Sequence, residues 1–219
     1  MTWVKICGIT NLEDALVAVD AGADAVGFVF YEKSPRHVTV EVAREICKKL
    51  PESVEKVGVF VGGTAEDASS VFHRVRLTTV QVYTGQTAEW LAWYQTEDIK
   101  LMFALPGDAL KGEFFIQFGT TTKPITALLV DSGSATVPGG TGECFDWEGA
   151  KIGIWHLKTE VPVVVAGGLT PDNVAEAIMT LHPWGVDVAS GVEARPGKKD
   201  PEKVRAFVRT VREADRKTG

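Results

Sequence analysis

The segment VPVVVAGGLTPDNVAEAIMTL, residues 161–181, holds one strand, one loop and one helix. Its strand, residues 163–166, is a continuous apolar run, which is typical of a parallel sheet buried on both faces. Apolar residues from Val174 to Leu181 then follow the i, i+3, i+4, i+7 spacing of one helical face. Thr170 and Pro171 predict the N-cap and the first position of this helix. The segment therefore predicts a complete βα unit.

The same unit recurs along the whole chain. Short apolar or β-branched runs alternate with helical patterns, and the runs start roughly 20 to 37 residues apart, the size of a βα unit. The expected strands are Val4–Cys7, Ala25–Phe30, Lys56–Phe60, Thr79–Val82, Lys100–Ala104, Ala127–Val130, Val163–Ala166 and Val186–Ala189.

Helix starts are marked by polar residues with capping spacing. Thr10 with Glu13 predicts a capping box. Thr64, with Asp67 three residues later, predicts the start of another helix. Asp146 is expected to cap a later helix. The interval 107–124 has the weakest pattern, and its run Phe114–Ile116 is compatible with a short helix or a loop.

Eight βα units are compatible with a doubly wound open sheet or a closed barrel. An open nucleotide-binding sheet would favour GxGxxG or GxxxxGK[ST] after its first strand. The first strand ends instead in Cys7-Gly8-Ile9-Thr10. We therefore predict an α/β fold, a (β/α)8 barrel, with residues 1–219 forming a single domain.

Composition narrows the class of protein. The 219 residues carry a net charge of −6, and the pI is about 5.3. This balance argues against a nucleic-acid partner, although a few local cations can still bind an anionic substrate. The three cysteines, Cys7, Cys47 and Cys144, form neither a disulfide framework nor a zinc pattern. The N-terminal residues do not have the pattern of a signal peptide, and no apolar stretch is long enough to span a membrane, so we expect a cytoplasmic protein.

In a (β/α)8 barrel the functional residues lie at the carboxyl ends of the strands. Gly167 and Gly168 follow the seventh strand, and Ser190 and Gly191 follow the eighth. Loops at these two positions commonly bind phosphate through backbone N–H groups. The alternative is that the glycines only shape tight turns. Because both loops carry them, we predict a phosphate site.

Two candidate reactive groups lie at other strand ends. Lys5 and Cys7 share a face of the first strand, and a nearby cation favours a thiolate. Cys7 could equally be an inert buried thiol, which is the interpretation given to Cys47. Asp131 closes the sixth strand, either as a loop cap or as a site carboxylate. The glycine-rich segment 132–146 after it is predicted to be a lid.

Arg36 is the remaining candidate from the residues alone. It follows Ser34-Pro35 in the second βα loop, where a guanidinium can grip a carboxylate or a phosphate through a bidentate fork. The alternative is a solvated surface arginine. The four histidines add no site residue.

The sequence resembles the phosphoribosylanthranilate isomerase family of tryptophan biosynthesis. The matching segments cover almost the whole chain in the family order: Lys5–Thr10, Gly27–Phe30, Ser34–Arg36, Val57–Phe60, Leu128–Ser132, Gly139–Gly142, Phe145–Trp147, Ala166–Leu169, Asn173-Val174, Ser190–Glu193, Pro196-Gly197 and Lys199-Asp200.

The resemblance implies an aldose–ketose isomerase that carries out an Amadori rearrangement without a redox cofactor or a metal. Cys7 would be the base that takes the proton from the sugar C2′. Asp131 would be the acid that protonates the furanose ring oxygen. Arg36 would hold the anthranilate part, and Asp187 would lie near the ribose. The phosphate would be bound by Gly168, Ser190 and Gly191, to which we add Gly167.

The chain departs from the family at two positions. Tyr83 occupies the place of the histidine in the usual Gln-x-His-Gly motif, and Ala189 replaces the first of two serines. A tyrosine does not titrate near neutral pH. We expect Tyr83 to stack or hydrogen-bond beside the aromatic substrate, and we count Lys5, Arg36, Tyr83 and Asp187 as substrate-binding residues.

Two other functions stay open at this point. One is a different phosphate-binding barrel isomerase with two aspartates as acid and base, although Cys7 stands where the first aspartate would be. The other is a barrel that binds a phosphorylated ligand without catalysis. The expected partner is a phosphorylated small molecule, and the chain is expected to be a monomer or a homodimer.

Overall fold

Eight parallel strands form a closed barrel in the computed structural model, with each strand hydrogen-bonded to the next and β8 to β1. The structure describes residues 1–83, 87–96, 98–106, 125–132, 146–158 and 161–218. The strands are β1 Trp3–Cys7, β2 Ala25–Val29, β3 Glu55–Val61, β4 Thr79–Tyr83, β5 Lys100–Pro106, β6 Ala127–Asp131, β7 Val163–Val165 and β8 Gly185–Val188.

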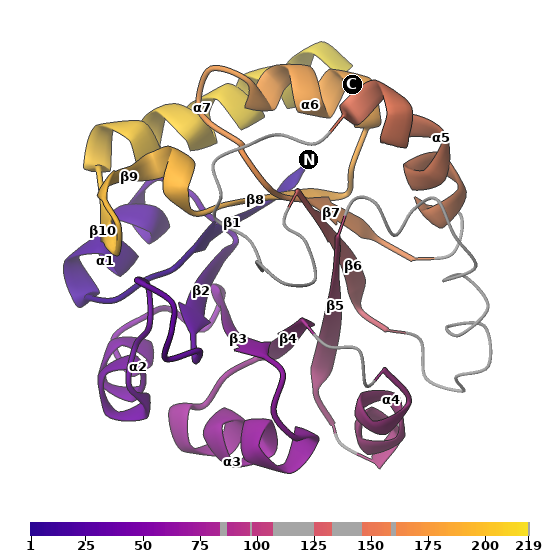
Figure 1. The fold of residues 1–219 in the computed structure, drawn as a ribbon. Coiled ribbons are helices and arrows are strands. Elements are labelled where there is room, and N and C mark those ends of the chain that lie inside the picture. Colours follow the sequence, from indigo (N-terminus) through magenta and orange to yellow (C-terminus); the bar gives the residue numbers. More distant parts are fainter. Residues whose placement is uncertain (84–86, 97, 107–124, 133–145, 159–160, 219) are drawn as a thin grey trace.

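The observed strands confirm the predicted (β/α)8 barrel. Helices surround the strands on the outside (Figure 1). They are α1 Leu12–Asp20, α2 Val40–Cys47, α3 Ala65–Val75, α4 Thr87–Thr96, α5 Trp147–Lys158, α6 Val174–Leu181 and α7 Pro201–Thr218. The interval 107–124 and most of the predicted lid, residues 133–145, lie outside the described residues.

Alternation along the strands separates three apolar clusters. Val4 and Ile6 of β1 belong to the large core shared with the helices. Met102 and Leu129 belong to a smaller cluster of alternate strand residues, and Cys7 belongs to a third with Val29 and Val59. Successive residues of a strand point to opposite faces of the sheet, so neighbours along one strand belong to different clusters. Lys5 and Cys7 consequently lie on the interior face of β1.

Two of the predicted helix caps are confirmed. The side chain of Thr64 accepts a hydrogen bond from the Asp67 amide at the start of α3. Asp146 accepts one from the Gly149 amide at the start of α5. In both places a short side-chain acceptor satisfies an amide that has no partner within the helix.

The other two predicted caps were wrong by one and three residues. Asn11, and not Thr10, caps α1 by accepting from the Asp14 amide. The hydroxyl of Thr10 instead donates to the Gly197 carbonyl at 2.6 Å. The helix predicted to start at Pro171 starts at Val174. Residues 170–173 first form a turn, in which the Thr170 amide donates to the Asn173 side-chain oxygen.

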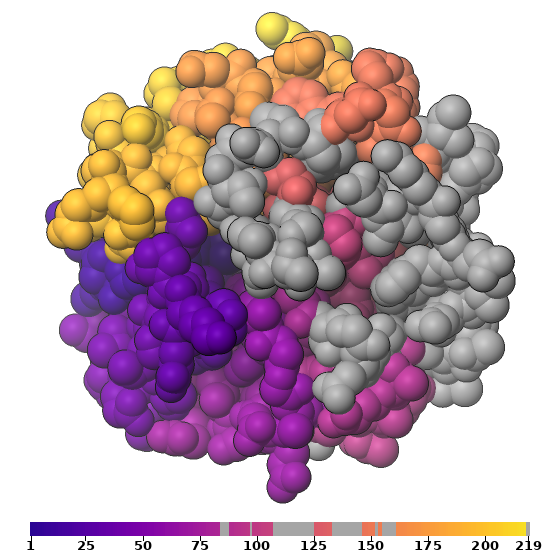
Figure 2. All heavy atoms as spheres, viewed as in Figure 1, coloured from indigo at the N-terminus to yellow at the C-terminus, as the bar shows by residue number. Residues whose placement is uncertain are grey.

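The chain after β8 packs back against the N-terminal part of the molecule. A 3-10 turn, η3 Ser190–Val192, leads into the hairpin of β9 Glu193–Arg195 and β10 Lys198–Lys199. The following helix, α7, packs against α1 and α6. Its Asp215 accepts hydrogen bonds from the amide and hydroxyl of Thr2. Figure 2 shows the gold spheres of the β9–β10 region beside the indigo and violet spheres of the N-terminal part of the chain.

No helix among the described residues is long and apolar enough to cross a membrane.

Candidate active site

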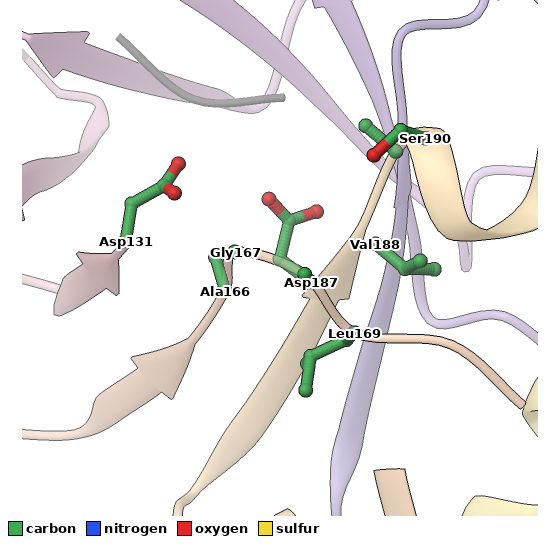
Figure 3. Close-up of a pocket in the computed structure, with 9 residues that line it drawn as sticks. Asp131, Ala166, Gly167, Leu169, Asp187, Val188 and Ser190 are labelled. Atoms are coloured by element: carbon green, nitrogen blue, oxygen red, sulfur yellow. The ribbon is translucent and has the colours of Figure 1, made fainter. Parts of the chain in front are cut away.

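Side chains from four strand ends converge at the mouth of the barrel. Cys7 ends β1, Tyr83 ends β4, Asp131 ends β6, and Asp187 lies near the end of β8. A pocket at this mouth is lined by Asp131, Ala166, Gly167, Gly168, Leu169, Asp187, Val188, Ala189 and Ser190. Figure 3 shows the carboxyl groups of Asp131 and Asp187 rising toward the same side of the pocket. The predicted acid and the predicted phosphate loops thus share one pocket.

Lys5 is held by Asp187 in the barrel interior. The two residues are paired in the β1–β8 register, and the Lys5 Nζ lies 2.8 Å from the Asp187 Oδ1. Burial alone would lower the pKa of Lys5, but the charges of Asp187 and Cys7 outweigh it and raise the pKa above its ordinary value. A permanent cation therefore lies beneath the Cys7 thiol.

The thiol of Cys7 occupies space that β2 leaves open. A Cβ added at Gly27 would lie 2.7 Å from the Cys7 Sγ, so a side chain there would displace the sulfur. Burial raises the pKa of Cys7 above its ordinary value, although Lys5 acts in the opposite direction. The expectation that the strand end favours the thiolate was therefore wrong for this structure, because burial outweighs the cation. Deprotonation of Cys7 depends on Lys5 all the more.

Replacing Lys5 with methionine tests this dependence. Removing the cation raises the pKa of Cys7 further, so the limb of the pH–rate profile that Cys7 controls should move to higher pH. The thiolate ultraviolet absorbance, followed in a variant that lacks the other two cysteines, should rise at a correspondingly higher pH. An absorbance titration identical to that of the lysine protein would show that Lys5 does not support the thiolate.

Asp131 is hydrogen-bonded to Tyr83 across the barrel mouth. The Tyr83 hydroxyl donates to the Asp131 Oδ2 at 2.8 Å, and the Ser132 hydroxyl lies 3.5 Å from Oδ1. Asp131 is 4% exposed. Of the two roles predicted for Asp131, the geometry favours the site carboxylate over the loop cap, because the carboxyl group lines the pocket beside Asp187.

The phosphate loops meet at a close backbone approach. Gly167 and Gly168 both have positive φ angles, +81° and +64°, which L side chains rarely adopt. A Cβ on Gly191 would collide with the Leu169 carbonyl. Ser190 starts the short η3 helix, and barrels of this kind often bind phosphate with the loops after strands seven and eight and an extra short helix. The loop geometry supports the predicted phosphate site.

Replacing Gly168 with alanine should weaken binding of a phosphorylated substrate more than turnover. The left-handed backbone costs a non-glycine residue about 1–2 kcal/mol, so the loop relaxes away from the anion. We expect KM to rise roughly tenfold, with kcat changing less, because the phosphate is remote from the reacting carbon.

Gly63 provides the matched control for this change. It has a φ of +76° and no atom within 4 Å of an added Cβ, but it lies after β3. The Gly63→Ala variant carries the same kind of backbone strain and should keep its KM. A lower kcat with an unchanged KM in the Gly168 variant would contradict the assigned phosphate role.

Arg36 is neither solvated nor free. Its Nε and Nη2 donate to both carboxylate oxygens of Glu193 at 2.9 Å. A Cβ on Gly8 would lie 2.6 Å from the Arg36 Cδ, so the arginine stem covers that glycine. The guanidinium has a second edge, formed by Nη1 and Nη2, with which it can meet a substrate carboxylate.

Glu193 and Lys199 are two site residues that the sequence patterns did not predict. The Lys199 Nζ donates to the Ala189 carbonyl at 2.9 Å and to the Glu193 Oε1 at 3.1 Å. Lys199 is 1% exposed. Burial lowers its pKa, and Glu193 only partly opposes this. The only signal was that both residues fall inside the motifs that carried the resemblance.

These contacts bear on the phosphate loop. A trans peptide directs its C=O and its N–H to opposite sides. Because Lys199 holds the Ala189 carbonyl, it also fixes the orientation of the following Ser190 amide.

Within the described residues, no group of three or more His, Cys, Asp or Glu side chains is placed to hold a metal ion.

Fold and site together define a (β/α)8-barrel enzyme with a thiol, a carboxyl group and glycine-rich anion loops at the carboxyl ends of its strands. A family model described as N-(5'phosphoribosyl)anthranilate (PRA) isomerase matches residues 4–210. The chain belongs to this family.

Individual relatives agree with the family match. The chain is 43% identical to the N-(5'-phosphoribosyl)anthranilate isomerase of Trichlorobacter lovleyi over 219 aligned residues, 98% of this chain and 100% of the relative.

Two solved structures have the same fold. One is a phosphoribosyl anthranilate isomerase in complex with reduced 1-(o-carboxyphenylamino)-1-deoxyribulose 5-phosphate, with a TM-score of 0.78 and 38% identity. The other shows monomers generated from the dimeric Thermotoga maritima enzyme, with a TM-score of 0.79 and 36% identity. Each alignment covers 97% of this chain and 100% of the chain in the solved structure.

Proposed function

We propose that this enzyme converts N-(5'-phosphoribosyl)anthranilate to 1-(2-carboxyphenylamino)-1-deoxyribulose 5-phosphate, the isomerase step of tryptophan biosynthesis. The family match and the named relatives support the reaction. The observation that carries it for this chain is the placement of Cys7 and Asp131 at the same barrel mouth as the Gly167–Gly168 and Ser190–Gly191 loops.

The proposed reaction starts at Asp131. Its protonated carboxyl gives a proton to the furanose oxygen, the ring C1′–O bond breaks, and the anthranilate nitrogen forms a Schiff base with C1′. The carboxyl is left as a carboxylate. A buried position suits this step, because Asp131 lies in a pocket whose walls include Ala166 and Leu169.

Cys7 completes the rearrangement. Its thiolate takes the proton from C2′, the electron pair neutralises the Schiff base, and the resulting enolamine tautomerises to the 2′-ketone. Substrate and product are isomers, so the step needs no oxidant or reductant. Lys5 supports the thiolate by its charge and is itself held by Asp187.

The non-reacting parts of the substrate orient C1′ and C2′. We assign the phosphate to Gly167, Gly168, Ser190 and Gly191. We assign the anthranilate carboxylate to the free edge of Arg36, which Glu193 holds in place. Binding energy from these two ends places the reacting carbons between acid and base.

The decisive experiment follows the anthranilate fluorescence of the substrate with purified protein. An isomerase consumes the signal with saturation kinetics, and free inorganic phosphate inhibits competitively. A phosphosugar-binding barrel without activity would perturb the signal on mixing and leave the substrate intact. A barrel isomerase for a different phosphosugar would leave the fluorescence unchanged. Either of these two results would overturn the proposal.

The remaining assignments follow from the same function. We propose that the enzyme is cytoplasmic and is a monomer or a homodimer. We also propose that residues 1–219 form one domain. The Thermotoga maritima relative is described as dimeric and also as monomers, which supports either state.

A further inference from the structure

Tyr83 has a contact that its expected role does not explain. The position holds a histidine in the usual family motif, and we expected a tyrosine to line the aromatic part of the substrate. Its hydroxyl instead donates to the Asp131 Oδ2 at 2.8 Å. The phenol thus touches the group that gives up a proton in the proposed function, on which this inference rests.

The barrel interior fixes the phenol in this place. Tyr83 packs against the cluster that includes Met102 and Leu129. It also packs against the cluster of Cys7, Val29 and Val59. A ring held between two apolar clusters loses little further entropy when its hydroxyl keeps one partner. This packing supports the hydrogen bond of the hydroxyl to Asp131.

The phenol also keeps its proton. Burial, followed by the Asp131 carboxylate, raises the pKa of Tyr83 well above its ordinary value of 10.0. A histidine at this position could change its charge near neutral pH, whereas this tyrosine is a neutral donor throughout the working range.

We propose that Tyr83 is a positioning residue for Asp131. Its hydroxyl donates to Oδ2 at 2.8 Å, a shorter contact than the 3.5 Å between the Ser132 hydroxyl and Oδ1, so Tyr83 sets the orientation of the carboxyl group. The same hydrogen bond strengthens as Asp131 becomes a carboxylate, because a hydrogen bond to an ionised acceptor is stronger than one to a neutral acceptor. Tyr83 thereby aims the acid and stabilises the charge left behind.

The remaining groups around Asp131 set the background for a pH test. Pro106 on β5 is its register partner, and Ala166, directly after β7, lines the same pocket, so neither neighbour brings a charge. Among the described residues, the charged or titratable groups that act on this part of the mouth are Asp187 on β8, Lys5 and Cys7 on β1, and Lys199 on β10. All of them are unchanged when only the Tyr83 hydroxyl is removed.

The test is the Tyr83→Phe variant, which removes one oxygen atom. We expect the limb of the pH–rate profile that Asp131 controls to move to higher pH by about one unit, because the ionised form loses a donor. The KM for the substrate should stay within twofold. If Tyr83 only lined the substrate, KM would rise and neither limb would move, and this result would overturn the proposal.

A second measurement does not need activity. The carboxyl carbon NMR signal of Asp131, assigned through its loss in Asp131→Asn, should titrate at higher pH in Tyr83→Phe than in the native enzyme. A coincident titration overturns the positioning role even if the enzyme proves to act on another substrate. Conversely, the titration could shift in a protein that does not convert phosphoribosylanthranilate. That result would overturn the proposed function and still support the positioning of Asp131 by Tyr83.

Two further variants separate positioning from packing. A fluorinated tyrosine at position 83 keeps the shape and donates more strongly, so it should move the Asp131 titration to lower pH. Tyr94→Phe is the matched control, since Tyr94 is also buried, at 2% exposure, but lies on α4. It should leave the pH profile unchanged. Opposite shifts for the Phe and fluorotyrosine variants support the proposal, and shifts of the same sign contradict it.

Discussion

The Cys7→Ser enzyme is expected to lose roughly 10² to 10⁴ in kcat, the usual contribution of a general base. Serine has nearly the same shape, so the cluster with Val29 and Val59 should remain packed. Its hydroxyl, however, cannot be ionised appreciably by the neighbouring Lys5. The substrate KM should change far less, because neither the phosphate loops nor Arg36 is altered.

Cys47 provides the control for general loss of a thiol. It is buried on α2, and burial raises its pKa to about 12, so it cannot serve as a base near neutrality. The Cys47→Ala variant should keep full kcat. Steady-state kinetics with both variants, together with thermal unfolding, would check the assignment. Retention of most of the turnover by Cys7→Ser would remove Cys7 from the chemistry and leave the proposed mechanism without its base.

The barrel was predictable because each strand carries its own signal. Strands such as Val163–Val165 are buried on both faces, so every residue is apolar, and the predicted and observed bounds differ by one or two residues at most. Helix starts were less predictable, since neighbouring residues compete for the cap. Thr10 has the right chemistry for a cap, but its hydroxyl donates to Gly197, which is distant in the sequence.

The site was predictable as far as strand ends and side-chain alternation define it. Those rules brought Cys7, Asp131 and the two glycine loops to one mouth. They could not predict partners that meet only when the barrel closes. The Lys5–Asp187 pair joins the first and last strands, and the contact of Arg36 with Glu193 spans a similar separation. The net effect of burial on Cys7 likewise depends on three-dimensional packing that a sequence pattern does not contain.

The Asp131→Asn enzyme should also lose roughly 10² to 10⁴ in kcat relative to the native enzyme, the usual contribution of a general acid. The amide has the shape of the carboxyl group, and its oxygen can still accept from Tyr83. It has no acidic proton to give to the furanose oxygen. Ring opening should therefore become rate-limiting, while KM changes little.

Asp146→Asn is the matched control, because Asp146 caps α5 by accepting from the Gly149 amide, and asparagine is an equally good cap. This variant loses a carboxylate from the same β6–α5 connection and should keep its activity. The pH profile then distinguishes a missing acid from a damaged site. In the Asp131→Asn enzyme the limb controlled by Asp131 disappears and the limb controlled by Cys7 stays, whereas a damaged site lowers the rate at every pH and keeps both limbs. Because Cys7→Ser removes the other limb, the two variants together assign each ionisation to one residue.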